Sequence, residues 1–322
     1  MKKGFLGYKQ VLMFVALVAM FGLSDVVSTQ RVSADEAPIG FVQNDNGARN
    51  YIKDGKKALY WHQLDGKWYY FGEDGNLVVG WQYIPTKYHI GVFEGDSIVE
   101  IGIFPKWFYF SAEGVLAEPG WQYLPIKDAV NTNKIYGQTV SDTGLGKQWY
   151  YLDKESSPVV GWLQKGDDWF LLSDEESHYG EMLTGWQGDY YLKENGYMAH
   201  NEWLYDDDYH SWFHLNADGK YAANQWVNGY YLKDWGYMAK AEWIFDKNYD
   251  SWYYLTEDGH YASNQWVGSY YLKDYGKMAH NEWIFDSHYD AWYYLHEDGT
   301  YAHNEWIGNY YLTSDGSWDA KG

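Results

Sequence analysis

Tryptophan side chains recur at a fixed interval in the last third of the chain, and their ring faces are groups that can do chemistry. Three pairs share the same internal separation and follow one another at one constant interval: Trp203 and Trp212, Trp243 and Trp252, and Trp283 and Trp292. A tryptophan face attracts a cation by roughly 0.5–2 kcal/mol. A groove lined by two or three such faces therefore predicts binding of an organic cation, above all a quaternary ammonium, which has no hydrogen-bond donors.

The interval belongs to a repeated unit, of which 203–242 and 243–282 are successive copies. More than half of the positions in the first copy are identical in the second. Within the unit, the step from Trp203 to Trp226 is longer than the step from Trp226 to Trp243, which divides the unit into a long and a short sub-repeat. Self-similarity at this period indicates a stacked repeat architecture, so the functional surface is expected to be repeated too.

Each sub-repeat has the pattern of a β-hairpin. The aromatic run from Trp252 to Leu255 favours a strand, and the following polar loop ends in Asp258-Gly259, a strong turn signal. Alternation along this strand places Trp252 on one face and Tyr253 and Leu255 on the other. We therefore expect the Tyr253 face to pack in the core and the Trp252 face to line a groove.

The same pattern continues upstream in looser form, with Gly-Trp pairs before aromatic strands such as Trp149–Leu152. Two stretches, Gln82–Lys106 and Gln122–Gln148, interrupt the spacing and predict lengthened loops or extra strands. About a dozen hairpins fill the chain from Tyr51 to Gly316, which leaves no room for a separate catalytic domain. The predicted fold class is all-β, a repeat solenoid of stacked β-hairpins.

The amino terminus has the pattern of an export signal. Basic residues precede an apolar run from Val11 to Leu23, and Val32-Ser33-Ala34 is a small-residue cleavage pattern. The run is too short to span a bilayer. We expect residues 1–34 to be removed, residues 35–185 to form degenerate repeats with two long insertions, and residues 186–322 to form regular repeats, with no membrane span in the mature chain.

Composition excludes several classes of function. The 322 residues carry a formal net charge of −21 and lack clustered Lys and Arg, so no nucleic-acid partner is expected. The absence of cysteine excludes disulfides, thiol nucleophiles and Cys-ligated zinc. Acidic pairs such as Asp206-Asp207 lie in repeated loops, and the histidines lack metal-ligand spacing. We therefore predict a protein that is not an enzyme, with no catalytic residues, no metal and no cofactor.

Taken as a whole, the unit resembles a known repeat. The unit is similar to the choline-binding repeat of streptococcal surface proteins. The shared pattern is Trp, about nine residues, Trp-Tyr-Tyr-Leu, an acidic residue and Gly, a Met and then Trp. The alternating long and short form especially resembles that of the pneumococcal wall glucosaminidase. The resemblance is specific over 186–316 and looser over 41–185. It implies a hairpin solenoid that holds choline between repeats, with phosphocholine on cell-wall teichoic acids as the target.

The resemblance also implies which residues form each choline site, an aromatic cage between successive repeats. Two walls of each cage would be the tryptophan pairs Trp203 and Trp212, Trp243 and Trp252, and Trp283 and Trp292. Strand parity favours Tyr231, Tyr271 and Tyr311 for the third wall, with Tyr230, Tyr270 and Tyr310 as the alternative register. Met238 and Met278 occupy the family's methionine position and either floor the cage or fill a gap. Trp162 and Trp169 are expected to form one more cage.

The short sub-repeats depart from this pattern. Where the family has the second tryptophan they carry Asp189, Gly229, Ser269 and Asn309. In the last unit Trp318 replaces the methionine. We therefore expect one good cage in each repeated unit.

Two other interpretations stay open. Glucan-binding repeats of secreted glucosyltransferases share the Gly-Trp pattern, and Asn224-Gln225 and Asn264-Gln265 would serve to bind sugar hydroxyls. Alternatively, wall-bound repeats would display residues 82–148 as an adhesin to a host protein. Since no carboxy-terminal sorting signal follows Gly316, we expect a secreted protein held noncovalently at the cell-wall surface.

Overall fold

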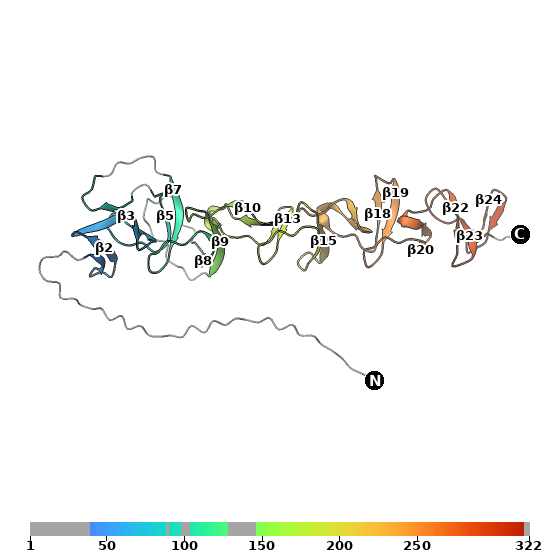
Figure 1. Ribbon diagram of the computed structural model, residues 1–322. Coiled ribbons are helices and arrows are strands. Elements are labelled where there is room, and N and C mark those ends of the chain that lie inside the picture. The colour runs from blue at the N-terminus through green and yellow to red at the C-terminus, as the bar shows by residue number, and fades with distance from the viewer. Residues whose placement is uncertain (1–38, 88–89, 98–103, 128–145, 319–322) are drawn as a thin grey trace, which may run out of the picture.

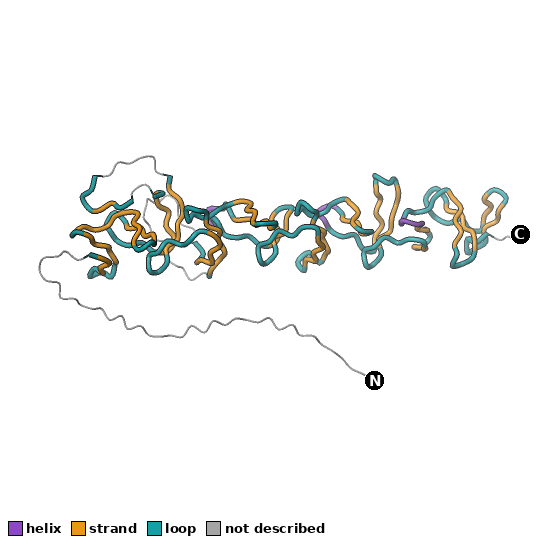
Figure 2. The backbone as a smooth tube through the Cα atoms, viewed as in Figure 1, coloured by secondary structure: helices purple, strands orange, loops and turns teal. Residues whose placement is uncertain are grey.

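The computed structural model describes residues 39–87, 90–97, 104–127 and 146–318. The predicted export signal, residues 1–34, lies outside them. The described chain runs from end to end as an extended row of small hairpins (Figure 1). Strands and connecting loops alternate along the whole row (Figure 2). The predicted class, an all-β solenoid of stacked hairpins, is confirmed.

The first hairpins belong to one five-stranded sheet. Its strands are β1 (Gly40–Gln43), β2 (Arg49–Lys53), β3 (Lys56–Leu64), β4 (Lys67–Phe71) and β6 (Val92–Phe93). The other described strands form two-stranded antiparallel sheets.

These pairs, in chain order, are β5 (Gly80–Pro85) with β7 (Pro105–Phe110), β8 (Gly120–Pro125) with β9 (Lys147–Leu152), β10 (Gly161–Lys165) with β11 (Asp168–Leu172), β12 (Gly185–Gln187) with β13 (Tyr190–Leu192), β14 (Glu202–Asp206) with β15 (Ser211–Leu215), β16 (Gln225–Val227) with β17 (Tyr230–Leu232), β18 (Glu242–Asp246) with β19 (Ser251–Leu255), β20 (Gln265–Val267) with β21 (Tyr270–Leu272), β22 (Glu282–Asp286) with β23 (Ala291–Leu295), and β24 (Glu305–Ile307) with β25 (Tyr310–Leu312). Three short 3-10 turns, η1 (Glu176–His178), η2 (Asp234–Gly236) and η3 (Asp274–Gly276), complete the described elements. Two-stranded sheets are marginal alone, so each hairpin depends on its neighbours.

The two insertions lengthen hairpins and add one strand. β5 and β7 stay paired as far as Pro85 and Pro105, and β8 and β9 as far as Pro125 and Lys147. The first insertion also supplies β6, which pairs with β3. Residues 88–89, 98–103 and 128–145 of the insertions lie outside the described part, so the division of the chain into degenerate and regular repeats stays a prediction.

The long hairpins follow the expected strand parity. Tyr253 and Leu255 are buried, with 4% and 0% of their surfaces exposed, whereas Trp252 is 43% exposed. Cross-strand register places Trp252 opposite Phe245 and Tyr253 opposite Ile244. One face of each long hairpin thus packs inward and leaves its tryptophan partly exposed.

The short hairpins use their tryptophans differently. The Trp226 indole Nε1 donates a hydrogen bond to Asp246 Oδ2 at 2.7 Å, and its ring lies 5.0 Å from Tyr231 and 4.8 Å from Tyr253. Trp186 with Asp206 and Trp266 with Asp286 repeat the hydrogen bond. These indoles tie each short hairpin to the long hairpin that follows it.

We predict that Asp246→Ala lowers the free energy of unfolding by about 1–3 kcal/mol. Asp246 is buried, and its loss leaves the Trp226 indole N–H without its acceptor. Urea denaturation of the full chain measures the change. Glu257→Ala, an exposed turn position, is the matched control and should stay within about 0.5 kcal/mol of the parent. Equal stability of the two variants would contradict a structural role for the indole–carboxylate bond.

Candidate functional site

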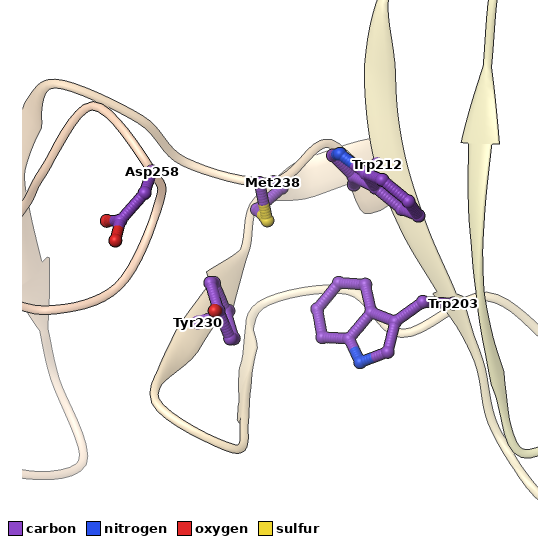
Figure 3. A pocket seen from close by; sticks show the side chains of 5 residues that line it. All are labelled: Trp203, Trp212, Tyr230, Met238 and Asp258. Atoms are coloured by element: carbon purple, nitrogen blue, oxygen red, sulfur yellow. The ribbon is translucent and has the colours of Figure 1, made fainter. Parts of the chain in front are cut away.

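An aromatic pocket lies where a long hairpin meets the short hairpin after it. Its walls are Trp203 from β14, Trp212 from β15 and Tyr230 from β17, around a space of about 380 Å³. Met238 and Asp258 complete the lining. Figure 3 shows the rings of Trp203, Trp212 and Tyr230 around one common space, with Asp258 beyond Met238 and Tyr230. The Trp203 and Tyr230 rings meet edge to face at 5.4 Å.

Three further pockets repeat this arrangement, and we call all four the cages. They are named by their first tryptophan and lined as follows: the Trp243 cage by Trp243, Trp252, Tyr270, Met278 and Asp298; the Trp283 cage by Trp283, Trp292, Tyr310 and Trp318; and the Trp162 cage by residues that include Trp162, Trp169, Tyr190, Met198 and Asp218. Their volumes, in that order, are about 310, 210 and 430 Å³. The structure thus brings together every predicted tryptophan pair.

The predicted third wall is wrong in register. The cages are lined by Tyr230, Tyr270 and Tyr310, the alternative register, and not by Tyr231, Tyr271 and Tyr311. These last three rings pack instead on Trp226, Trp266 and Trp306 of their own hairpins, at 5.0, 5.1 and 5.3 Å.

The reason lies on the inward side of the short hairpin. Ala222, Leu232 and Met238 form a buried cluster against which Trp203 and Tyr230 pack. Core and cage therefore share one side of the short hairpin, so the tyrosine with the parity of the buried leucine becomes the cage wall.

Both predicted methionines lie in cages, and a backbone hydrogen bond places each of them. The Met238 amide donates to the Trp212 carbonyl at 3.1 Å, and the Met278 amide to the Trp252 carbonyl at 2.9 Å. Both side chains are largely buried and contribute an apolar lining. Trp318, whose amide donates to the Trp292 carbonyl at 2.8 Å, takes the same position in the Trp283 cage.

An acidic residue at three of the cages does not emerge from the sequence analysis. Asp218, Asp258 and Asp298 line these cages from the turn that follows the next long hairpin, at the interval of the repeat. The Thr256 hydroxyl donates to Asp258 and the Thr300 hydroxyl to Asp298, and these bonds hold the pKa of each carboxyl below its usual range. Both carboxylates are therefore ionised at neutral pH. The Asp-Gly signal by itself predicts only a turn.

The spacing of tryptophans in the sequence also does not predict a fifth tryptophan pair. Trp121 and Trp149 have ring centroids 6.4 Å apart, the same separation as Trp162 and Trp169. Phe170 lies 4.7 Å from Trp121, and the Met182 amide donates to the Trp149 carbonyl at 2.8 Å. The second insertion lies between Trp121 and Trp149 in the sequence, so spacing alone conceals the pair.

The described part of the chain offers no metal site and no membrane helix. Within it, no group of three or more His, Cys, Asp or Glu side chains is placed to hold a metal ion. Among the same residues, no helix has the length and apolar character needed to cross a bilayer. One member of the acidic pair has a structural role, because Asp206 accepts from the Trp186 indole at 2.8 Å and from two backbone amides.

Stacked β-hairpins with an aromatic pocket between one hairpin and the next define a binding module built from repeats. A family model, the choline-binding repeat, matches residues 260–301. The solved structure of CbpJ from Streptococcus pneumoniae TIGR4 is 32% identical and aligns with 88% of this chain and 100% of its own, with a TM-score of 0.60. Choline-binding protein F from Streptococcus pneumoniae is 31% identical over the same shares, with a TM-score of 0.57. The chain belongs to this family of pneumococcal-type choline-binding proteins.

Longer proteins also match. Glucosyltransferase-S of Streptococcus mutans is 25% identical over 246 residues, which are 59% of this chain and 17% of that protein. A putative endo-beta-N-acetylglucosaminidase of Streptococcus pneumoniae is 33% identical over 80 residues, 24% of this chain and 11% of that protein. The chain therefore spans only a small part of the curated relatives that it matches.

Proposed function

We propose that this protein is a non-catalytic cell-surface protein that attaches to phosphocholine on teichoic acids through its aromatic cages. The observation that carries the proposal is the recurrence of one arrangement, two tryptophans and a ring of the next hairpin, at four places along the chain. A ligand repeated along a polymer matches a site repeated along a rigid protein.

The lining favours a cation over a sugar. Three electron-rich ring faces and an ionised carboxylate at the rim attract a quaternary ammonium and offer few partners for sugar hydroxyls. The asparagines expected to serve a sugar are otherwise engaged: Asn224 Nδ2 donates to Asp234 and Asn264 Nδ2 to Asp274, each within its own hairpin. Glucan binding, the alternative function, therefore has less support from the lining of these four cages.

The remaining parts of the proposal rest on the sequence. Residues 1–34 would direct export, 35–185 would form the degenerate half of the solenoid and 186–322 the regular half. The mature protein would then be held at the wall noncovalently. The hairpins with insertions, around residues 82–148, would be the surface available to a host protein. In this mechanism many cages act together on one polymer. Each cage binds its ammonium group weakly, through a short-range attraction in a partly desolvated site.

The expected result is saturable binding of choline and none of dextran. Only the ammonium head of choline can be enclosed, so each cage should have a dissociation constant near 1 mM, about −4 kcal/mol. Calorimetric titration of the mature protein gives affinity and stoichiometry. The same protein should be eluted from a choline-bearing resin by free choline, and raised salt should matter little. Elution by salt alone, or binding of dextran with no response to choline, would overturn the proposal.

A further inference from the structure

Two lysines lie on aromatic rings at the amino-terminal end of the solenoid. Lys87 Nζ is 4.5 Å from the Trp68 ring centroid and 5.5 Å from that of Trp61. Lys127 Nζ is 4.8 Å from the Trp107 ring and 4.9 Å from the Tyr179 ring. Lys127 is 2% exposed, so its ammonium group has little contact with water. All four distances fall within the range of cation–π attraction.

The rings around Lys87 are arranged as in the four cages. Trp61 of β3 and Trp68 of β4 meet edge to face with centroids 6.2 Å apart. Phe108 of the next hairpin lies 5.0 Å from Trp61, edge to face, as Tyr230 lies against Trp203. The Leu116 amide donates to the Trp68 carbonyl at 2.9 Å, the bond that Met238 makes to Trp212. Position by position, this is a cage with Phe and Leu in place of Tyr and Met.

The Trp107 ring, on which Lys127 lies, belongs to the next hairpin in the same series. Trp81 of β5 and Trp107 of β7 supply the tryptophan pair, and Tyr150 lies 4.9 Å from Trp81 as the ring of the following hairpin. Tyr179 packs against the same cluster. Lys127 thus lies on the hairpin tryptophan of a second cage and on Tyr179, and its ammonium group donates a hydrogen bond to the Tyr179 carbonyl at 3.0 Å.

One sequence motif positions both lysines. β5 continues as Gly-Trp-Gln-Tyr-Ile-Pro-Thr-Lys and β8 as Gly-Trp-Gln-Tyr-Leu-Pro-Ile-Lys, so each lysine follows a proline at the same offset. The opening tryptophan of a neighbouring hairpin fixes each proline: the Trp61 indole donates to the Pro85 carbonyl at 2.9 Å and the Trp81 indole to the Pro125 carbonyl at 2.8 Å. The same geometry therefore delivers a lysine to two successive cages.

The short hairpins of the regular repeats turn back before the position at which the proline and lysine of this motif would stand. After Trp226 the chain turns back at Asn228-Gly229, short of the position from which a lysine would reach a cage. The walls at the amino-terminal end keep the tryptophan pair, and in each case a lysine lies on its hairpin tryptophan. Burial lowers the pKa of both ammonium groups, that of Lys127 to about 8, which leaves Lys127 predominantly charged at pH 7.

We infer that Lys87 and Lys127 are internal ligands of the two amino-terminal cages, where each ammonium group takes the place of a choline head and closes the cage to free choline. A tethered cation has no translational entropy to lose on entering its cage, so millimolar choline cannot displace it. The cages left for the wall then lie beyond these two. This inference rests on the proposed function, because it requires that the open cages bind ammonium groups.

The test follows tryptophan indole N–H signals of the full mature chain, labelled with ¹⁵N-tryptophan, during titration with choline. In the parent protein the signals of Trp203 and Trp212 should move and those of Trp61 and Trp68 should not. In Lys87→Ala, the Trp61 and Trp68 signals should move as well, with an apparent dissociation constant within about tenfold of that at the Trp203 cage. Lys127→Ala should do the same for Trp107, and unchanged positions of the remaining signals report that each variant is folded.

Two control variants complete the experiment. Lys87→Arg keeps a cation in the cage and should gain no response at Trp61 or Trp68. Lys165→Ala removes a lysine 4.0 Å from the Tyr151 ring that does not follow a proline motif, and should also gain none. The inference is overturned if Trp61 and Trp68 respond in the parent, or if neither alanine variant gains a response while Trp203 and Trp212 still move. No response at any tryptophan of the parent would instead refute the proposed function.

Discussion

Deleting residues 243–322 should reduce binding to choline-bearing cell walls by roughly 10²–10⁴-fold, far more than the loss of two cages would suggest if sites acted singly. Each cage is expected to hold choline only weakly, so attachment depends on simultaneous occupation along one polymer. The deletion removes the Trp243 and Trp283 cages and takes Asp258 from the Trp203 cage. Sedimentation of each protein with purified walls, over a range of wall concentrations, measures the change.

A matched variant separates lost avidity from lost structure. Trp252→Ala combined with Trp292→Ala opens the same two cages while the chain keeps its length, its buried leucines and its inter-hairpin hydrogen bonds. It should lose wall binding to a similar extent as the deletion. If the deletion or the double variant bound walls as tightly as the whole chain, the multivalent mechanism would be wrong.

Trp252→Ala alone should abolish most choline binding at one cage and leave the fold intact. The ring is 43% exposed and lines the Trp243 cage, whereas the adjacent Tyr253 and Leu255 remain in the core. Losing one tryptophan wall removes about 1–2 kcal/mol of affinity, roughly tenfold or more at that site. Titration with choline should show one site weakened, with circular dichroism and thermal unfolding close to those of the parent.

The control for this variant is Trp235→Ala. Trp235 lies in η2, the turn that follows a short hairpin, is 76% exposed and lines none of the four cages. Its loss should leave choline affinity and stoichiometry unchanged. An unaltered titration in Trp252→Ala, or an equal loss in Trp235→Ala, would remove Trp252 from the binding site.

Local periodicity in the sequence determined the architecture. The constant interval between tryptophan pairs, the aromatic strands and the Asp-Gly turns predict stacked hairpins because strand propensity and turn chemistry are properties of a few adjacent residues. Alternation within a strand likewise determined the faces of the long hairpin, with Tyr253 inside and Trp252 partly exposed. The tryptophan pairs of the cages followed from spacing, since both members belong to one hairpin.

Contacts between hairpins were decided only by the tertiary structure. Whether Tyr230 or Tyr231 closes a cage depends on which side of a short hairpin faces the one before it, and a strand's period of two leaves that choice open. Asp258 reaches its cage from the next repeat, and Lys87 and Lys127 reach the Trp68 and Trp107 rings from the inserted segments. The sequence determined what each hairpin is, whereas the packing of successive hairpins determined which side chains meet, because those meetings depend on the rotation from one hairpin to the next.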